Sequence, residues 1–291
     1  MQVHLVDGTY ELFRHHFGAP SHLDPDGIEV AAARGVVGSM LMLLEQGATH
    51  VGVATDQVIE SFRNDLWPGY KTSAGVPPEL LAQFPVVEDA LAALGLAVWP
   101  MVELEADDAM ASAAAVAVAD PRVERVLICT PDKDLGQCVV DPVVAQVDRR
   151  KDLIIDEAGV RAKFGVEPSS IPDYLALVGD SADGFPGIPG WGAKSAGAVL
   201  ARYGHLDAIP DDATEWDVDV RGKAKLASAL AVARDAATLF LDLATLRTTA
   251  DVGLVDDWEW RGPEPQLAAW GERFGSDSLY PRANRLAGQR A

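Results

Sequence analysis

Acidic residues follow several short apolar runs of the sequence, and two more precede a glycine-rich turn. The acids that follow the apolar runs are Asp7, Asp56, Glu105, Asp107, Asp108, Asp132 and Asp134, and the pair before the turn is Asp180 and Asp183. Carboxylates that converge without cations repel one another, and their pKa values rise. Hard divalent cations such as Mg²⁺ or Mn²⁺ prefer oxygen ligands and offset that repulsion. Because two such ions commonly promote in-line attack on a phosphodiester, the pattern indicates metal-dependent phosphodiester hydrolysis.

The spacing inside two of these clusters supports a shared site. In ELEADD, Glu105 and Asp108 are three residues apart and share a face if a helix begins there, with Asp107 beside them. In TPDKDLG, Asp132 and Asp134 are two residues apart, so an extended loop would point both side chains the same way.

Each acid taken alone has a simpler interpretation. Asp7 or Asp56 fits a turn or a helix N-cap, and the EADD stretch fits a helix start whose acids complement the helix dipole. Lys133 fits a surface ion pair, and we assign it no role. The metal hypothesis therefore depends on the acids occurring together.

The elements that would position these acids alternate between strand-like and helix-like segments. Short apolar runs at 2–6, 50–55, 95–100 and 123–130 are typical of buried parallel strands, and helix-like stretches lie at 29–46, 79–94 and 106–119. This alternation predicts an α/β fold, with a parallel sheet covered by helices on both faces. Ligands of such sheets bind beyond the carboxyl ends of the strands, where the acids stand. After about residue 155 the pattern is mostly helical, with a loop-rich connection at 205–220.

Composition limits the classes of protein. The chain has 291 residues, of which 48% are hydrophobic and 23% charged, an ordinary balance for a globular protein. No apolar run is long enough for a membrane span, and the N-terminus lacks a signal-peptide pattern. Cys129 and Cys138 form no disulfide framework or metal motif. We therefore expect a cytoplasmic protein with no membrane partner.

The net charge of −20 argues first against a nucleic-acid partner, because polyanions attract basic surfaces. The charge is unevenly distributed, however: residues 72–121 contain no Lys or Arg. The basic residues of the helical part include Lys194, Arg202, Arg221, Lys223, Lys225 and Arg234. An acidic metal pocket and a modestly basic helical flank are consistent with this distribution.

The glycine-rich turn lies in GDSADGFPGIPGWGAKSAG, residues 179–197. A nucleotide-binding P-loop would need glycine before Lys194, and a dinucleotide fingerprint would need glycine where Ser195 stands. Gly190 and Gly192, with Ala196 four residues further on, instead fit the turn between two helices whose amides face a DNA phosphate. A plain helix–helix turn is the alternative.

These motifs together resemble the 5′ nucleases, the family of 5′–3′ exonucleases and flap endonucleases, and most closely the 5′-nuclease domain of bacterial DNA polymerase I. The resemblance rests on VDGTYELFR (6–14), SFRNDLWPGYK (61–71), ELEADDAMAS (103–112), TPDKDLGQCV (130–139) and the 179–197 stretch. It implies a PIN-like α/β domain at 1–155 with an arch segment at about 72–95. It also implies a helical DNA-binding region at 156–291, with a helix–three-turn–helix element and its helix–hairpin–helix-like turn at 183–203.

The resemblance also implies roles for individual residues. One divalent cation would be held by Asp7, Asp56, Glu105 and Asp107, with Asp108 close by, and a second by Asp132, Asp134, Asp180 and Asp183. Lys71, Arg63 and Arg14 would be catalytic, Lys71 as a phosphate-contacting residue that helps to stabilise the transition state. For Arg63 an ion pair with a neighbouring carboxylate is the alternative. DNA contacts would come from Gly190, Gly192, Lys194, Ser195, Arg221, Lys223 and Lys225, and the turn at 187–192 would hold K⁺ through backbone carbonyls.

We therefore predict a 5′–3′ exonuclease that uses Mg²⁺ or Mn²⁺, with flap endonuclease activity, acting on DNA 5′ ends or RNA–DNA hybrids in replication or repair. Two alternatives remain. Because the arch segment lacks basic residues, the chain could bind branched DNA and cleave it poorly. A PIN-type ribonuclease would share the acidic pocket but would not need the 179–197 turn.

Overall fold

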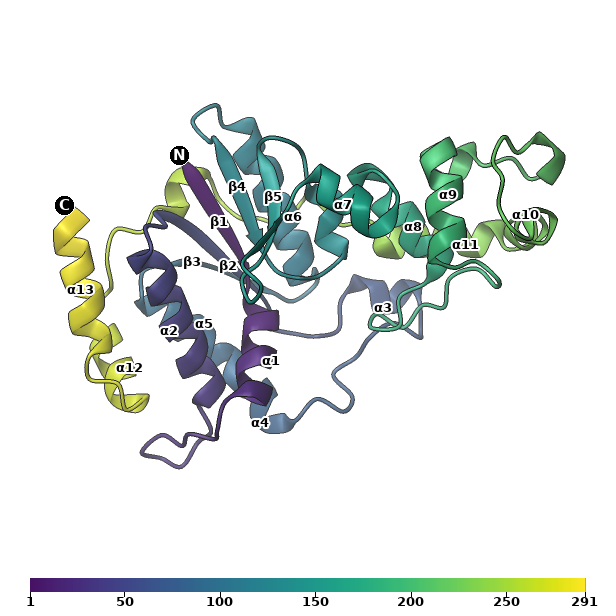
Figure 1. Cartoon of the computed structure of the whole chain (residues 1–291). Coiled ribbons are helices and arrows are strands. Elements are labelled where there is room, and N and C mark those ends of the chain that lie inside the picture. Colours follow the sequence, from purple (N-terminus) through teal and green to yellow (C-terminus); the bar gives the residue numbers. More distant parts are fainter. Residues whose placement is uncertain (291) are drawn as a thin grey trace. The chain divides into compact units, whose positions relative to one another are not determined.

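Four parallel strands end at the predicted acids or within four residues before them. In the computed structural model, which describes residues 1–290, they are β1 (Gln2–Asp7), β2 (His50–Asp56), β3 (Ala97–Met101) and β4 (Arg125–Cys129). They lie in the order β3-β2-β1-β4 (Figure 1), and Val6 is in register with Val53 and Cys129. The carboxyl ends of the strands therefore meet at one edge, as the sequence predicted.

These strands belong to the first of two compact units, formed by residues 1–59, 73–130 and 248–291. Its helices are α1 (Gly8–Gly18), α2 (Ala31–Glu45), α4 (Pro78–Leu81), α5 (Gln83–Ala93), α6 (Ala106–Ala119), α12 (Leu267–Arg273) and α13 (Leu279–Arg290), with a 3₁₀ turn η5 (Val255–Trp258). Val6 of β1 and Val53 of β2 share a core with α2 and α5. Leu5 of β1 and Ile128 of β4 are also buried, but they lie outside that cluster. Because strand side chains alternate between faces and α6 contacts all four strands, helices cover both sides of the sheet.

Part of the segment predicted as an arch belongs to this core. Phe84, Val87 and Leu91 of α5 are buried, as is Leu80 of α4. Residues 72–77 precede these helices and contain no helix or strand. The arch remains a prediction. Because α4 and α5 pack in the core, the residues left for an arch are those before α4.

The second unit consists of residues 60–72 and 131–247. Its helices are α3 (Phe62–Leu66), α7 (Glu157–Phe164), α8 (Ile171–Val178), α9 (Ala193–Tyr203), α10 (Lys223–Val232) and α11 (Arg234–Ala244). Short 3₁₀ turns, η1 (Asp134–Cys138), η2 (Pro168–Ser170), η3 (Leu206–Ala208) and η4 (Ala213–Glu215), complete it with an antiparallel pair, β5 (Val144–Asp148) and β6 (Leu153–Ile155). The helical character after residue 155 and the loop-rich segment at 205–220 are confirmed.

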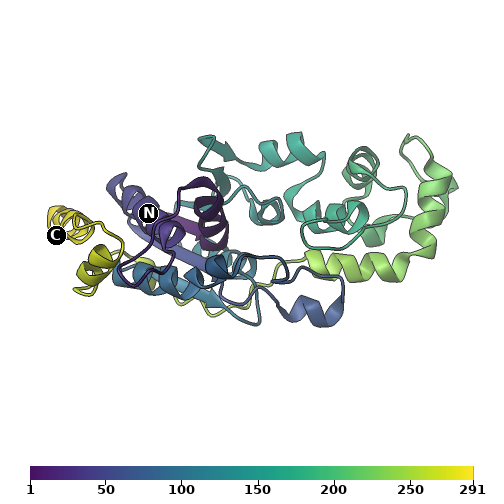
Figure 2. The ribbon, with the colours of Figure 1, turned by 90° about the horizontal axis from the view of Figure 1, so that it is seen from below.

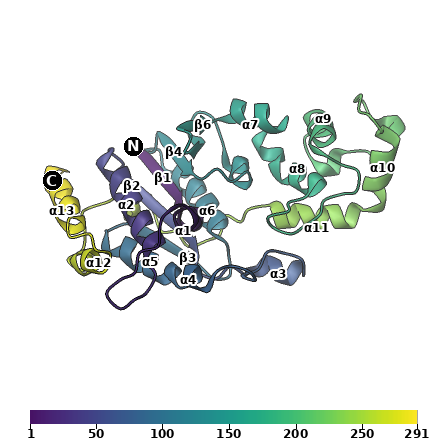
Figure 3. The same cartoon turned by 60° about the horizontal axis from the view of Figure 1, so that its bottom comes forward.

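Helix α8 is central to the second unit. It contacts α9 and α11, which flank it in the views from below (Figures 2 and 3). Leu175, Leu177, Val199 and Phe240 are buried in the core that these helices share. Residues 179–192 join α8 and α9, so two helices flank the glycine-rich turn, and the helix–hairpin–helix-like turn at 183–203 remains a prediction.

The linker between α8 and α9 depends on glycine at two close approaches. Gly187 has a positive φ of 68°, and a Cβ built on it would lie 2.7 Å from the carbonyl oxygen of Leu177. Gly184 has a φ of 82°, and its Cβ would lie 2.0 Å from the carbonyl oxygen of Gly69. Because only glycine tolerates both the φ value and the contact, Gly187 lets the linker lie close to the end of α8, and Gly184 lets it lie close to Gly69.

No helix within residues 1–290 has the length and apolar character that crossing a membrane would require.

Candidate metal centre and nucleic-acid interface

Asp7 stands where β1 passes directly into α1. Its Oδ1 accepts a hydrogen bond from the amide of Tyr10 at 2.7 Å, and its Oδ2 accepts from the hydroxyl of Thr130 at 2.8 Å. Asp7 is therefore the N-cap of α1, the simpler of its two interpretations, and it is buried. The cap and the threonine hold the carboxylate at the edge of the sheet.

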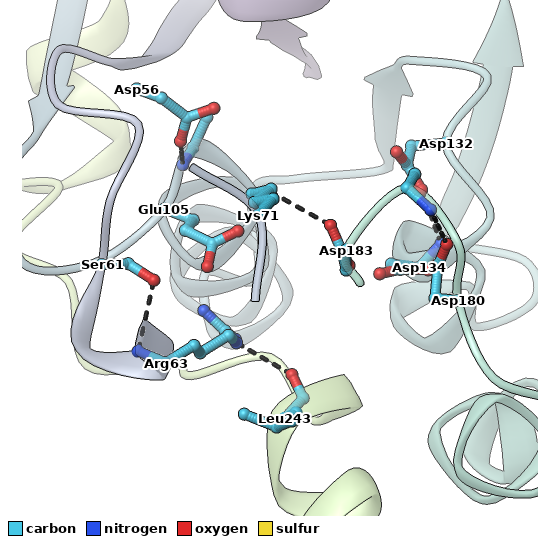
Figure 4. A network of polar contacts seen from close by, with 12 residues as sticks. Asp56, Ser61, Arg63, Lys71, Glu105, Asp132, Asp134, Asp180, Asp183 and Leu243 are labelled. Atoms are coloured by element: carbon cyan, nitrogen blue, oxygen red, sulfur yellow. Dashed lines mark hydrogen bonds and ion pairs between the residues drawn. The ribbon is translucent and has the colours of Figure 1, made fainter. Parts of the chain in front are cut away.

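Asp56 and Glu105 are brought together at the start of α6. Oδ1 of Asp56 accepts from the amide of Ala106 at 2.7 Å (Figure 4), and the amide of Glu105 donates to Oδ2 of Asp108 at 3.0 Å. The helix therefore begins where the ELEADD spacing requires it to begin. Asp56, Glu105 and Asp108 are buried, and Asp107 is partly exposed.

The first unit thus places its acids at one edge without forming a tight cluster. Among the residues that the structure describes, no three carboxylates of this unit alone bring ligand atoms within 4.8 Å of one another. Their role as one metal's ligands remains a prediction.

The loop predicted as extended at residues 132–134 turns at Lys133 instead, but the predicted shared direction holds, because Asp132 and Asp134 offer oxygens within 4.8 Å of each other. The amide of Asp134 donates to Oδ1 of Asp132 at 3.0 Å, and the backbone then enters the 3₁₀ turn η1. An aspartate that accepts from the amide two residues later favours a turn over an extended strand. As a result Asp132 is exposed whereas Asp134 is buried, so the two side chains differ in their surroundings.

Three carboxylates of the second unit come within metal-binding reach. Asp134, Asp180 and Asp183 offer ligand oxygens that lie within 4.8 Å of one another. Asp134 is only 6% exposed, and its Oδ1 is buried without a hydrogen-bond partner. A buried carboxylate oxygen that accepts no hydrogen bond is costly, and the Lys133 ammonium, 3.9 Å from Oδ1, is too far away to donate one. These residues therefore fit a hard divalent cation.

Electrostatics support the same interpretation. Burial raises the pKa of the Asp134 carboxyl well above its ordinary value, and the charges of Asp132, Asp183 and Asp180 raise it further. Burial lowers the pKa of Lys133, but the attraction of Asp134 and the other aspartates outweighs it, so the Lys133 pKa is raised overall. The site therefore strongly favours additional positive charge.

Two lysines already contact this group. The ammonium of Lys71 lies 3.4 Å from Oδ1 of Asp183, as Figure 4 shows, and the Lys71 amide donates to the Asp183 carbonyl at 3.0 Å. Lys133 pairs with Oδ2 of Asp180 and lies 3.9 Å from Oδ1 of Asp134. Lys71 is thus placed beside a candidate ligand, whereas Lys133 contacts two.

The two predicted catalytic arginines are held by the protein itself. Arg14 pairs with Glu11, and its Nη2 lies 2.9 Å from Nε2 of His15. Arg63 is 1% exposed; it donates to the carbonyl oxygen of Leu243 at 2.8 Å (Figure 4) and to that of Thr245 at 3.3 Å. This placement links α3 to the end of α11. The catalytic role of Arg63 stays a prediction that its burial does not favour.

The predicted DNA contacts fall into exposed and tethered groups. Gly190, Gly192, Lys194, Arg221 and Lys225 are exposed. By contrast, the hydroxyl of Ser195 both accepts from the amide and donates to the carbonyl of Gly192, and the Lys223 ammonium donates to the Trp216 carbonyl. Ser195 therefore shapes the turn at the start of α9, and Lys223 anchors α10.

The sequence interpretation missed three supporting residues. Thr9 accepts from the amide of Asp56 at 2.8 Å, and Thr130 donates to Asp7. Each threonine stands within two residues of an acid or a strand end, and this spacing could have identified it as a partner of the acids. The third is Lys133, which lies between two predicted ligands and faces two carboxylates.

The chain belongs to the 5′–3′ exonuclease family. Residues 2–165 match the model of the 5′–3′ exonuclease N-terminal resolvase-like domain, and residues 166–266 match that of the 5′–3′ exonuclease C-terminal SAM fold. Members of this family are metal-dependent nucleases, which agrees with the acidic group of the second unit.

Curated relatives agree with the family. DNA polymerase I of Rhizobium leguminosarum is 37% identical over 272 residues, which cover 90% of this chain and 26% of the relative. DNA polymerase I of Pseudomonas aeruginosa is 33% identical over 275 residues, covering 91% of this chain and 29% of the relative. The chain therefore spans little more than a quarter of the length of these relatives.

A solved structure agrees with the fold. The crystal structure of the bacteriophage T5 flap endonuclease, a pseudo-enzyme-product complex with DNA and metal ions, matches with a TM-score of 0.68 at 20% identity. The match covers 99% of this chain and all of that one. The predicted α/β fold with a C-terminal helical region is confirmed.

Proposed function

We propose that this protein hydrolyses phosphodiester bonds at DNA 5′ ends as a 5′–3′ exonuclease, with flap endonuclease activity, in replication or repair. The observation that carries the proposal is the group Asp134, Asp180 and Asp183, whose oxygens lie within 4.8 Å and include a buried oxygen without a donor. Family membership supports the reaction class.

The proposed cofactors are two divalent cations, Mg²⁺ or Mn²⁺. The second-unit ligands would be Asp132, Asp134, Asp180 and Asp183, and those of the first unit would be Asp7, Asp56, Glu105, Asp107 and Asp108. Bound cations would lower the pKa of a ligated water and offset the negative charge that develops on the phosphate.

The protein's own residues have distinct parts in this proposal. Lys71 is held beside Asp183 by its backbone and its ammonium, a position from which it would donate to a phosphate oxygen near that ligand. Arg14 pairs with Glu11. In order to contact a phosphate near Asp7, it would have to leave that partner.

The proposed partner is DNA with 5′ ends or flaps, including RNA–DNA hybrids, bound by a monomer. Gly190, Gly192 and Lys194 are exposed at the start of α9, where backbone amides and a helix dipole suit a phosphate. Carbonyls of the 187–192 turn would hold K⁺ between the protein and that phosphate. Replacing K⁺ by a bulky organic cation at equal ionic strength should then weaken DNA binding.

The test of the nuclease proposal is release of product from 5′-labelled flap and blunt DNA with Mg²⁺ or Mn²⁺. Wild type should cleave, and an Asp132→Ala/Asp134→Ala variant should not. Equal background rates for the two proteins would overturn the proposal.

One observation favours a second candidate, a branched-DNA-binding protein that cleaves poorly. Residues 72–121, which follow Lys71, contain no basic residue that could hold a single-stranded flap. Tight, salt-dependent binding of flap DNA without cleavage in the presence of metal would support this candidate. Cleavage of matched RNA and DNA substrates would distinguish the 5′ nuclease and the DNA-binding protein from a ribonuclease.

A further inference from the structure

Lys133 has no part in the proposed reaction, yet its charge lies inside the proposed metal group. Its ammonium pairs with Oδ2 of Asp180 and lies 3.9 Å from Oδ1 of Asp134. The side chain is 33% exposed, so much of it is removed from water. One lysine therefore contacts two of the three carboxylates that approach within metal-binding reach.

Local structure fixes both partners of this contact. The Lys133 carbonyl accepts from the amide of Gly136 at 3.0 Å, which holds the backbone at the start of η1. Oδ1 of Asp180 accepts from the amide of Ala182 at 3.0 Å. With Oδ1 engaged in this way, Oδ2 is the Asp180 oxygen that the lysine holds. A cation that approaches Oδ2 therefore meets the ammonium.

We propose that Lys133 is the resident counter-ion of the Asp134–Asp180–Asp183 group, and that a divalent cation must displace it from Asp180 in order to bind. The inference rests on the metal site of the proposed function. In the metal-free protein, Lys133 offsets part of the repulsion among the buried carboxylates. In the metal-bound protein its charge repels the cation, so Lys133 lowers the affinity of the site for metal.

This role differs from that of Lys71. Lys71 contacts Asp183, and in the proposed function it would donate to a substrate phosphate. Lys133 instead contacts the two most buried of the three carboxylates, Asp134 and Asp180, which are 6% and 4% exposed. Removal of the Lys133 charge should therefore change metal affinity even when no DNA is present.

The test is calorimetric titration of the full chain with Mn²⁺, without DNA, for wild type and three variants. Lys133→Met should lower the dissociation constant for Mn²⁺ by about tenfold or more, because a like charge leaves the site. Lys133→Arg keeps the charge and should stay near wild type. Lys151→Met makes the same change in net charge at a 73% exposed lysine that pairs with Asp148, and should change the constant by less than about twofold.

A second measurement guards against loss of folding in the variants. Thermal unfolding followed by circular dichroism should show a lower Tm for Lys133→Met than for wild type in EDTA, and a larger rise of Tm with saturating Mn²⁺. Lys133→Gln, which is smaller and polar, should show the same two changes. A Tm in EDTA equal to that of wild type counts against the proposal.

The outcomes separate this inference from the proposed function. If wild type binds Mn²⁺ and Lys133→Met binds it equally or more weakly, the counter-ion role is wrong and the metal site stands. If neither protein binds Mn²⁺, the metal site itself is wrong, and the counter-ion role fails with it.

Discussion

The amide of Lys71 donates to the carbonyl oxygen of Asp183 at 3.0 Å, and the Lys71 ammonium lies 3.4 Å from the Asp183 carboxylate. Two contacts, one through the backbone and one through the side chain, thus join a proposed phosphate-contacting lysine to a proposed metal ligand. The nearby hydrogen bond from Trp67 Nε1 to the Gly184 carbonyl, at 3.1 Å, holds the same two segments together. The position of Lys71 is therefore set by the linker between α8 and α9.

Substitution of Lys71 should slow chemistry more than it weakens binding. Lys71→Ala should reduce the single-turnover rate by about 10²–10³-fold, because one preorganised donor to the developing charge is lost. The dissociation constant of the Lys71→Ala variant for flap DNA should change by less than about fivefold, since one phosphate contact contributes little to affinity. Rapid-quench kinetics and fluorescence anisotropy measure the two quantities. A rate loss matched by an equal loss of affinity would contradict a transition-state role.

Asp134→Asn should abolish activity and yet stabilise the metal-free protein. The substitution removes a buried negative charge that faces other aspartates. Its free energy of unfolding in EDTA should rise by roughly 1–2 kcal/mol. Asp132→Asn, at an exposed neighbour, is the control and should change that free energy less. Urea unfolding in EDTA measures both, and a less stable Asp134→Asn protein would show that the charge is well compensated.

Gly184→Ala should destabilise the protein far more than Gly190→Ala. Both residues have positive φ, of 82° and 87°, which costs a non-glycine residue roughly 1–3 kcal/mol. Only at position 184 does a Cβ also meet backbone, at 2.0 Å from the Gly69 carbonyl oxygen, whereas position 190 is open. Urea unfolding should therefore separate the two variants by about 2 kcal/mol or more. An equal loss of unfolding free energy in both variants would mean that residues 67–71 move to accommodate the added methyl group.

Exposed and tethered lysines should differ in their effect on DNA binding. Lys194→Ala and Lys225→Ala should each reduce the slope of log affinity against log salt by about one, because each removes one phosphate contact. Lys223→Ala should alter that slope less and lower stability instead, since its ammonium already donates to the Trp216 carbonyl. Anisotropy titrations over a range of KCl concentrations test this comparison. A larger slope change for Lys223 than for Lys194 would reverse the assignment.

His50 should make the protein less stable in acid. Burial lowers the pKa of His50, opposed by Glu259 and Asp256 and aided by Arg122 and the N-terminus. The folded protein thus binds fewer protons at this group than the unfolded chain below about pH 6.5, and its stability falls as the pH falls through that range. His50→Gln should flatten the dependence of unfolding free energy on pH between about 5 and 7. An unchanged slope would assign the acid sensitivity to other groups.

Most of the fold could be predicted from the sequence because its signals are local. The four apolar runs became β1 to β4, and the alanine-rich stretch at 106–119 became α6 with the same limits. The helix pair around 179–192 followed from its glycine spacing. In each case, strand and helix propensity agrees with the burial that the fold imposes.

The site was less predictable because partners come from distant segments. The interpretation of residues 132–134 as extended failed, since a side-chain hydrogen bond from the backbone favoured a turn. Nothing local indicates that Arg63 donates to carbonyls near residue 244, or that Lys133 reaches Asp180. Residue type predicts the chemistry available, whereas the choice of partner depends on tertiary contacts.

The hydrophobic core of the first unit has a consequence for synthesis of the chain on the ribosome. That core takes Trp260, Leu267 and Phe274 from the last segment, whereas every residue of the second unit precedes position 248. Translation therefore delivers the whole second unit before the sheet that begins at residue 2 can complete its packing. Until then, a largely apolar α2 and α5 lack part of their cover, a state in which nascent chains are prone to associate. A premature stop near residue 250 would therefore leave the core of the first unit incomplete, although the sheet at the start of the chain had already been synthesised.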